Sequence, residues 1–149
     1  MVSDENQVTY GNSHELFVTA KANGDSVVMG GVAQDSSRWV RILSNRAAQL
    51  LWFQLAQLLF PDQAKSATTV VTTAPMRDAS LPTVTAHCVA ERKADGLFVI
   101  SGWAGSKMWQ VQIEPDEMDR FWPVLDGAMY PGGSGIKASE PAPNPTPSQ

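Results

Sequence analysis

The chain has 149 residues, a formal net charge of −4 and 43% hydrophobic residues, which is typical of one soluble globular domain. Its mild acidity gives no overall attraction to nucleic acid or to anionic membranes, although a local basic patch can override the mean. The single cysteine, Cys88, excludes an intramolecular disulfide and a cysteine-based zinc site. The opening segment MVSDENQVTY lacks a basic stretch followed by an apolar one, so we expect no secretory signal and a cytoplasmic protein.

In chain order, the polar residues 1–13 are expected to be flexible. The next part of the chain is rich in β-branched and aromatic residues interrupted by turn signals, which is typical of strands. The predicted strands are 15–20, 26–32 and 37–43. A turn at Asn23-Gly24-Asp25 joins the first two. Ser44 then stands at an N-cap position before the apolar run RAAQLLWFQLAQLLFP (46–61), which we predict to be a helix.

The second part of the chain repeats this order. Its predicted strands are 67–74, 82–92, 96–104 and 107–113. A second helix begins at Pro115, a tolerated first position, and the acids that follow favour the positive end of the helix dipole. Pro123 lies inside this helix and should kink or end it. Residues 132–149 are Gly/Ser-rich and then Pro-rich, so we expect a disordered tail that is either inert or a docking motif.

Two segments of 24 residues, 38–61 and 108–131, align without a gap at a shift of 70 positions. Further matches upstream need small insertions, as hairpin loops usually do. The matched residues are Trp39 with Trp109, Trp52 with Trp122, Gly31 with Gly102, and 18–20 with 84–86. Paired tryptophans in a chain with five of them favour an internal repeat over coincidence.

We therefore predict a single α+β domain over 14–131, built from two half-repeats, 14–61 and 67–131. Each half is an antiparallel meander followed by one helix, with about seven or eight strands and two helices in total. These paired meander-plus-helix halves, each ending in an aromatic-Pro step, resemble the Whirly and PC4-like group. The resemblance implies a pseudo-twofold domain and, as in many members of that group, binding of single-stranded DNA or RNA. The lysine-rich strand surface of a nucleic-acid-binding Whirly protein is missing from this sequence.

The first predicted helix is unusual because it is apolar on two sides. Its apolar core, 47–60, is too short for a bilayer span of about 20 residues. Burying each large apolar side chain stabilises by about 1.5–3 kcal/mol, so its outer side is covered either by the rest of the chain or by another protein. Glutamines among these residues suit an interface, since they hydrogen-bond without bringing a charge to desolvate. The predicted partner-binding residues are Leu50, Phe53, Gln54, Gln57 and Trp103.

No catalytic constellation is visible. His87 and Cys88 are neighbours in a predicted strand, so they point to opposite faces and cannot bind one metal ion together. The sequence has no nucleophile elbow, Walker loop or dinucleotide fingerprint. We therefore predict a protein that is not an enzyme, with no cofactor, no metal ion and no small-molecule substrate.

Two functions stay open. The acidic charge, the doubly apolar helix and the Pro-rich tail favour a non-enzymatic adaptor or assembly chaperone that binds a protein partner, or a second copy, through the first helix. Its Gln- and Pro-containing style is similar to small cyanobacterial assembly factors that serve photosynthetic or carbon-fixation (carboxysome-type) complexes. The alternative is a single-strand nucleic-acid-binding protein, which needs a basic, aromatic strand surface. Candidates for that surface are Arg38, Trp39, Arg41 and Lys107, although Trp39 and Arg41 also suit packing within the fold.

Overall fold

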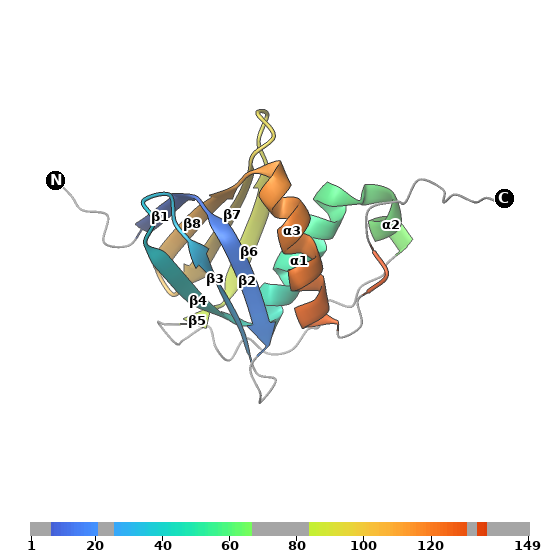
Figure 1. Cartoon of the computed structure of the whole chain (residues 1–149). Coiled ribbons are helices and arrows are strands. Elements are labelled where there is room, and N and C mark those ends of the chain that lie inside the picture. Colours follow the sequence, from blue (N-terminus) through green and yellow to red (C-terminus); the bar gives the residue numbers. More distant parts are fainter. Residues whose placement is uncertain (1–6, 21–25, 67–83, 131–133, 137–149) are drawn as a thin grey trace.

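The computed structural model describes residues 7–20, 26–66, 84–130 and 134–136 (Figure 1). Within these ranges the chain forms eight strands and three helices, which confirms the predicted α+β class. In chain order the elements are β1 (Gln7–Asn12), β2 (His14–Ala20), β3 (Ser26–Val32), β4 (Arg38–Ser44), α1 (Asn45–Leu59), α2 (Pro61–Ser66), β5 (Val84–Thr85), β6 (His87–Arg92), β7 (Phe98–Ala104), β8 (Lys107–Ile113) and α3 (Pro115–Met129).

Two four-stranded sheets contain these strands. Sheet A has the order β1-β8-β7-β6, and sheet B has the order β2-β3-β4-β5. The meanders β2-β3-β4 and β6-β7-β8 are antiparallel, whereas β1 pairs in parallel with β8 and β5 pairs in parallel with β4. The strand that precedes each meander therefore crosses to the sheet of the other half. This crossing makes β5 the counterpart of β1, so the predicted match of 18–20 with 84–86 is wrong.

Several boundaries differ from the sequence-based expectations. The prediction of a flexible segment over all of 1–13 is wrong for Gln7–Asn12, which forms β1. This strand is held by backbone pairing with β8, and its polar sequence QVTYGN gives no indication of that pairing. The predicted strand over 82–92 breaks at Ala86 into β5 and β6, and α2 is an additional short helix. The predicted strand 67–74, and all of the predicted tail except 134–136, lie outside the described residues.

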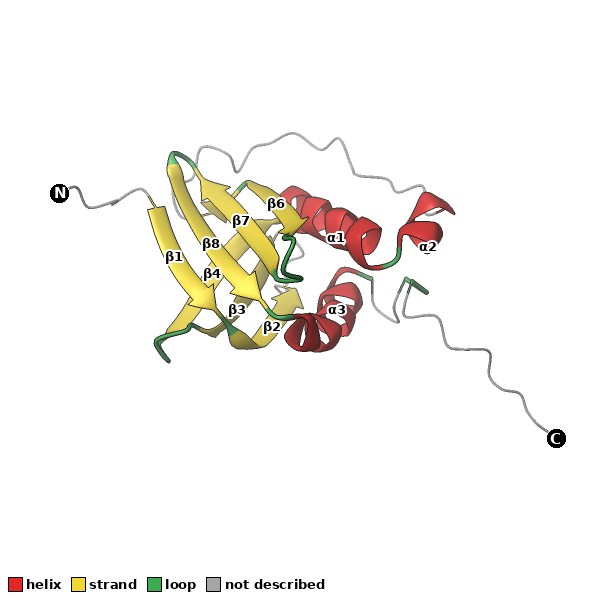
Figure 2. Cartoon of the chain, turned by 90° about the horizontal axis from the view of Figure 1, so that it is seen from above, coloured by secondary structure: helices red, strands yellow, loops and turns green. Residues whose placement is uncertain are grey.

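The two long helices lie together at one end of the sheets (Figure 2). Helix α1 begins after the predicted N-cap, where the Ser44 hydroxyl accepts a hydrogen bond from the Ala47 N–H at 3.1 Å. Each helix packs against the first meander strand of the other half, α1 against β6 and α3 against β2. Helix α3 continues past Pro123 to Met129, so the proline does not end it. Proline removes only one helical hydrogen bond, and Pro123 lies on the exposed side.

The matched glycines and tryptophans explain how the sheets pack on each other. Gly31 pairs with Trp39 across β3 and β4, and Gly102 pairs with Trp109 across β7 and β8. A Cβ at Gly102 would collide with the Trp109 indole, so glycine lets the ring lie across the neighbouring strand. Both tryptophans are buried, with ring centroids 5.9 Å apart, and Tyr10 stacks on Trp39 at 4.6 Å. These aromatic rings form the centre of the core between the sheets.

A second aromatic pair joins the helices. Trp52 of α1 and Trp122 of α3 have ring centroids 5.8 Å apart. The Trp52 indole N–H donates to Asp126 Oδ1 at 2.8 Å, and the Trp122 indole N–H donates to the Ile136 carbonyl at 3.0 Å. The buried Asp126 carboxylate also accepts a hydrogen bond from the Ser134 N–H at 3.0 Å. The segment after α3 is therefore attached to the helix pair.

Candidate functional site

The outer face of sheet B is apolar. Successive strand residues point to opposite faces, and on β3 and β4 the buried Val27, Met29, Trp39 and Leu43 alternate with less buried residues. The register aligns the outward positions in two rows across the strands. One row is Phe17, Gly30 and Val40, and the other is Thr19, Val28, Ile42 and Val84. We call these seven residues the outer face of sheet B.

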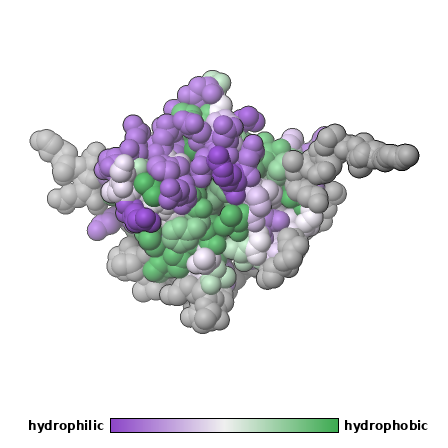
Figure 3. Space-filling view, in the orientation of Figure 1, coloured by the Kyte–Doolittle hydropathy of each residue, from purple (hydrophilic) through white to green (hydrophobic). Residues whose placement is uncertain are grey.

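Exposure is greatest in the row that contains Gly30. The Val40 side chain is 57% exposed and Phe17 is 38% exposed, which makes them two of the four large apolar residues most open to solvent in the described chain. The Phe17 ring lies over Gly30, where an added Cβ would be 2.7 Å from the ring. In the space-filling view, a hydrophobic patch covers this part of β2, β3 and β4, with hydrophilic residues along its upper side (Figure 3).

A tight turn sets the register that aligns these rows. Between β3 and β4, the Ala33 N–H donates to the Ser37 carbonyl at 2.7 Å. Asp35 Oδ1 accepts hydrogen bonds from the Ser37 hydroxyl at 2.6 Å and from the Ser37 N–H at 2.9 Å. These two hydrogen bonds, the hydroxyl first, lower the pKa of the Asp35 carboxyl because they favour its charged form. The turn thereby places Gly30 opposite Val40 rather than one residue out of step.

The corresponding outer face of sheet A is mixed, with Val99, Trp103 and Met108 among polar residues. At the positions of Val40 and Ile42, β8 carries Gln110 and Gln112. The Gln110 side-chain amide donates to the Ser101 hydroxyl on β7 at 3.1 Å. Trp103, a predicted partner-binding residue, lies on this face and is half-buried, with its ring 5.6 Å from the exposed His87 imidazole. Trp103 is therefore part of sheet A rather than of the α1 surface.

Among the predicted partner-binding residues of α1, the structure gives Gln54 a different role. The Gln54 amide donates to the Cys88 carbonyl at 2.9 Å and accepts from the Ala90 N–H at 2.9 Å, both on the open edge of β6. Its side chain thus replaces a neighbouring strand, which corrects its assignment to a partner contact. Leu50 and Phe53 are half-buried, Phe53 packs against the core, and Gln57 is exposed.

A second glutamine closes part of the β1 edge in the same way. The Gln34 N–H donates to the Tyr10 carbonyl at 3.0 Å, and its side-chain oxygen accepts from the Asn12 N–H at 3.1 Å. A carbonyl and the N–H two residues later are the groups that an edge strand presents on one side. Gln34 and Gln54 therefore block strand addition at the edges they occupy.

The four candidate nucleic-acid-binding residues do not form one surface. Trp39 is 5% exposed and stacks inside the core, so it is not a platform for a base. Arg41 faces the core, where its Nε donates to the Tyr10 hydroxyl at 2.8 Å and its guanidinium lies over the Trp109 ring. Arg38 is exposed at the start of β4 in sheet B, and Lys107 is exposed at the start of β8 in sheet A.

Within the part of the chain that the structure describes, the titratable residues form no reactive site that the geometry supports. Burial raises the pKa of the Cys88 thiol to about 12, which keeps it protonated and unreactive at neutral pH. Across 7–20, 26–66, 84–130 and 134–136, no group of three His, Cys, Asp or Glu side chains is placed to hold a metal ion. No helix in these ranges is long and apolar enough to cross a membrane.

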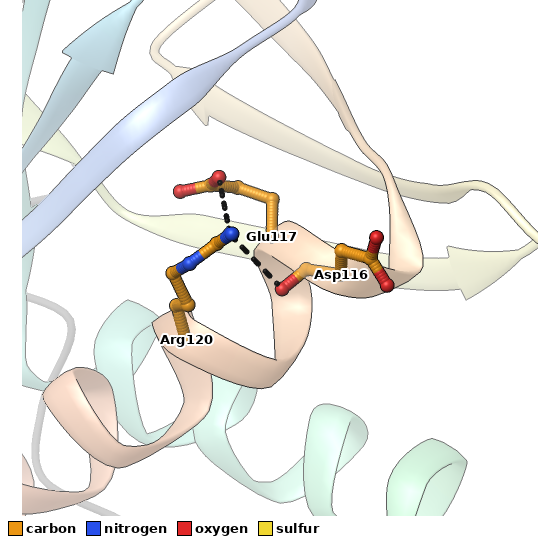
Figure 4. A network of polar contacts seen from close by, with 3 residues as sticks. All are labelled: Asp116, Glu117 and Arg120. Carbon is orange, nitrogen blue, oxygen red and sulfur yellow. Dashed lines mark hydrogen bonds and ion pairs between the residues drawn. The ribbon is translucent and has the colours of Figure 1, made fainter.

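A polar cavity of about 330 Å³ lies where β1 and β2 meet the start of α3. Its lining includes Glu117 and Arg120, whose side chains interact across one turn of α3 (Figure 4). The Arg120 guanidinium donates to Glu117 Oε1 at 3.3 Å and to the Asp116 carbonyl at 3.4 Å. These contacts neutralise the basic group locally and provide no activated nucleophile.

Sequence reasoning missed the outer face of sheet B, although a signal was present. SVVMGGV and RWVRIL are apolar at consecutive positions, whereas a sheet with one solvated face alternates apolar and polar residues. A strand with two apolar faces is expected to have both faces packed against protein, as is also expected for the two apolar sides of α1.

Comparison with models of protein families, with curated proteins and with solved structures found no match for this chain. The resemblance to the Whirly and PC4-like group stays a prediction, and function is argued from the site geometry.

Proposed function

We propose that the protein is a non-enzymatic adaptor or assembly chaperone, and that it binds its protein partner on the outer face of sheet B. The observation that carries this proposal is the pair of exposed side chains Phe17 and Val40, which flank the buried Gly30 beside the half-buried Val28 and Ile42. Contiguous apolar patches bordered by polar residues mark interaction sites on soluble proteins. Covering each such side chain stabilises a complex by about 1.5–3 kcal/mol.

Sheet A supports this interpretation because it shows what the fold itself requires. Sheet A has the same strand order about its meander, yet Gln110 and Gln112 occupy the positions of Val40 and Ile42. A sheet of this architecture is therefore compatible with glutamine at both of these outward positions. The exposed Phe17 and Val40 side chains point away from the core, and a binding role accounts for them.

The test replaces two apolar residues of sheet B with those of sheet A. A double variant, Val40→Gln with Ile42→Gln, should keep its fold, because glutamine occupies both matched positions on β8. A photoreactive residue introduced at Val40 in the full-length protein should form a covalent adduct with the partner, to be identified by mass spectrometry and then reconstituted from purified components. The same group placed at Gln110 is the matched control and should give no adduct.

Binding of the reconstituted partner should be lost in the double variant and retained in Leu50→Gln on α1. If the double variant unfolds, Val40→Thr keeps the branched shape and reduces only the apolarity. Equal partner binding by a folded double variant and the unmodified protein would show that the outer face of sheet B is not the binding surface. Loss of binding in Leu50→Gln alone would move the surface to α1.

A further inference from the structure

We infer that the element recognised on the outer face of sheet B is a single amphipathic helix of a partner protein, about three turns long, with a carboxylate near Arg38. This inference rests on the proposed function and specifies the chemistry of the partner. Three properties of the face carry it: its size, its scarcity of hydrogen-bonding groups, and the exposed Arg38 beside it.

The size of the face suits a helix better than a second copy of the chain. Four strands about 4.8 Å apart span about 14 Å, and two rows separated by about 7 Å add a similar length once side chains are included. Two such faces would bury roughly 600–800 Å² in total, well below the 1,200 Å² or more of a stable protein–protein interface. A helix about 10 Å wide and about 16 Å long, or 11 residues, covers the same area without leaving the rest of a second domain unpaired, and it would bind as a weak, transient contact.

The chemistry of the face disfavours a single extended segment lying across it. Six of the seven outward positions are Phe, Gly, Val or Ile, and only Thr19 carries a polar group. An extended chain would leave its backbone N–H and C=O groups unpaired against this surface, at about 1–3 kcal/mol for each buried group. A helix hydrogen-bonds its own backbone and presents only side chains.

Addition of a strand at an edge of sheet B is also restricted. Helix α3 packs against β2 at one edge, and at the other edge β5 contributes only Val84 and Thr85 within the described chain. The two edges of sheet A are partly closed by Gln34 and Gln54. Side-chain packing on the face therefore remains the available mode of recognition.

Arg38 selects the charge at one end of the bound helix. It pairs with Val32 across β3 and β4, one row beyond Gly30 and Val40, and its side chain is exposed. The described residues provide no ion pair for Arg38, and the nearby Asp35 carboxylate accepts hydrogen bonds from Ser37 instead. A partner carboxylate at this end would form the ion pair, whose contribution at an exposed rim is about two- to fivefold in affinity.

The experiment selects peptides on the immobilised full-length protein. Two display libraries of about 14 residues are used, one patterned for amphipathic helices and one with the alternating pattern of strands. We expect enrichment from the helical library, with apolar residues at positions i, i+3, i+4 and i+7 and Asp or Glu at one end. A synthetic enriched peptide, measured by fluorescence anisotropy, should lose about 30-fold in affinity for the variant with Val40→Gln and Ile42→Gln.

Charge reversal tests the orientation. Arg38→Glu should weaken the acidic peptide by about fivefold and strengthen a version with lysine in place of its acid by a similar factor. Leu50→Gln on α1 is the control variant and should leave both affinities unchanged. Equal affinity of both peptides for the protein and for Arg38→Glu would overturn the role of Arg38.

The remaining outcomes separate this inference from the proposed function. Enrichment of strand-patterned peptides alone, with binding that needs Val40, would overturn the helix and leave the docking surface intact. A concentration-dependent dimer in sedimentation that disappears with Val40→Gln would identify a second copy as the occupant and also overturn the helix. Helical peptides that bind the double glutamine variant equally well would contradict both the inference and the surface on which it rests.

Discussion

The two halves of the molecule match inside and differ outside. Inside, each half has a Gly–Trp pair across two strands, and each indole donates to a hydroxyl, Trp39 to Ser13 at 3.2 Å and Trp109 to Thr85 at 2.9 Å. Outside, β4 carries Val40 and Ile42 where β8 carries Gln110 and Gln112. The shared Gly–Trp pairs are residues that the fold requires in both halves. The outer residues that differ are not required by the fold.

The helices differ in the same manner. At matched positions, α1 has Gln54 on the edge of β6, whereas α3 has Val124, which is 39% exposed. Two residues later the roles reverse: α3 carries the buried Asp126 where α1 has the buried Ala56. Each half thus contributes one polar side chain, Gln54 or Asp126, that hydrogen-bonds to the other half. Exchanging residues between matched positions tests how far the two halves are equivalent.

The largest expected effect is at Asp126, a buried carboxylate that has no counterpart in α1. Asp126→Ala leaves the buried Trp52 indole N–H and the Ser134 N–H without their acceptor. We expect a loss of about 3–4 kcal/mol in the free energy of unfolding, measured by urea denaturation. Asp119→Ala on the exposed side of the same helix should change stability by less than about 0.5 kcal/mol. An equally small effect of both variants would contradict the role of Asp126.

The second prediction compares the two glycines of the matched Gly–Trp pairs. Gly102→Ala places a methyl group against the rigid Trp109 ring, and we expect it to cost about 3 kcal/mol through overpacking. At Gly31 the nearest atom is the end of the Leu16 side chain, 2.7 Å from the added Cβ, which can rotate away, and the next is the His14 carbonyl oxygen at 3.1 Å, which needs to shift by only a few tenths of an ångström. Gly31→Ala should therefore cost only about 1 kcal/mol. Equal losses in chemical denaturation would show that the two pairs are more alike than their surroundings indicate.

Local patterns in the sequence predict the repeated parts of this fold well. The meander strands, the start of α1 at Ser44 and the matched Gly31 and Gly102 depend on residues close in the chain or on an alignment of the two halves. The strands β1 and β5 were harder to predict because each forms through parallel pairing with the other half's meander. Nothing in QVTYGN itself specifies that distant partner.

In the candidate site, too, features set by neighbouring residues could be predicted, and contacts with distant parts of the chain could not. The outward direction of Val40 and Ile42 follows from strand alternation, so an apolar outer face could have been predicted from two consecutive apolar patterns. The role of Gln54 could not, since a helical projection gives the direction of the amide but not the strand edge that it meets. Its hydrogen bonds to Cys88 and Ala90 exist only because α1 packs across the halves.

The third prediction exchanges the residues at this matched helix position. Gln54→Val leaves the Cys88 carbonyl and the Ala90 N–H on the β6 edge unpaired, and should cost about 2 kcal/mol. Val124→Gln should be within about 0.5 kcal/mol of the unmodified protein because the site is partly exposed. Amide hydrogen exchange provides a local readout: the Ala90 N–H should lose protection in Gln54→Val only. Unchanged protection at Ala90 would mean that the amide is not needed to close this edge.

The smallest effect concerns Cys88 in β6, which pairs with Gly102 in β7. Burial raises the pKa of its thiol from 9.0 to about 12, so the folded protein holds this proton more tightly than the unfolded chain. The associated stability is complete below pH 9 and is lost as the pH rises toward 12. By pH 10 the unmodified protein should have lost about 1.4 kcal/mol from this source relative to pH 7.

Cys88→Ala removes the thiol and separates this effect from other alkaline titrations. Burial, together with the Asp126 charge, also raises the pKa of Tyr130, but Tyr130 is present in both proteins and its effect cancels in the difference. The stability gap between the unmodified protein and Cys88→Ala should thus narrow by about 1.4 kcal/mol from pH 7 to pH 10. Leu16→Ala removes a buried, non-titrating side chain beside the matched Gly31, so its gap should stay constant. If the Cys88→Ala gap were as constant as the Leu16→Ala gap, the thiol would titrate alike in folded and unfolded chains, and the burial of Cys88 would not control its chemistry.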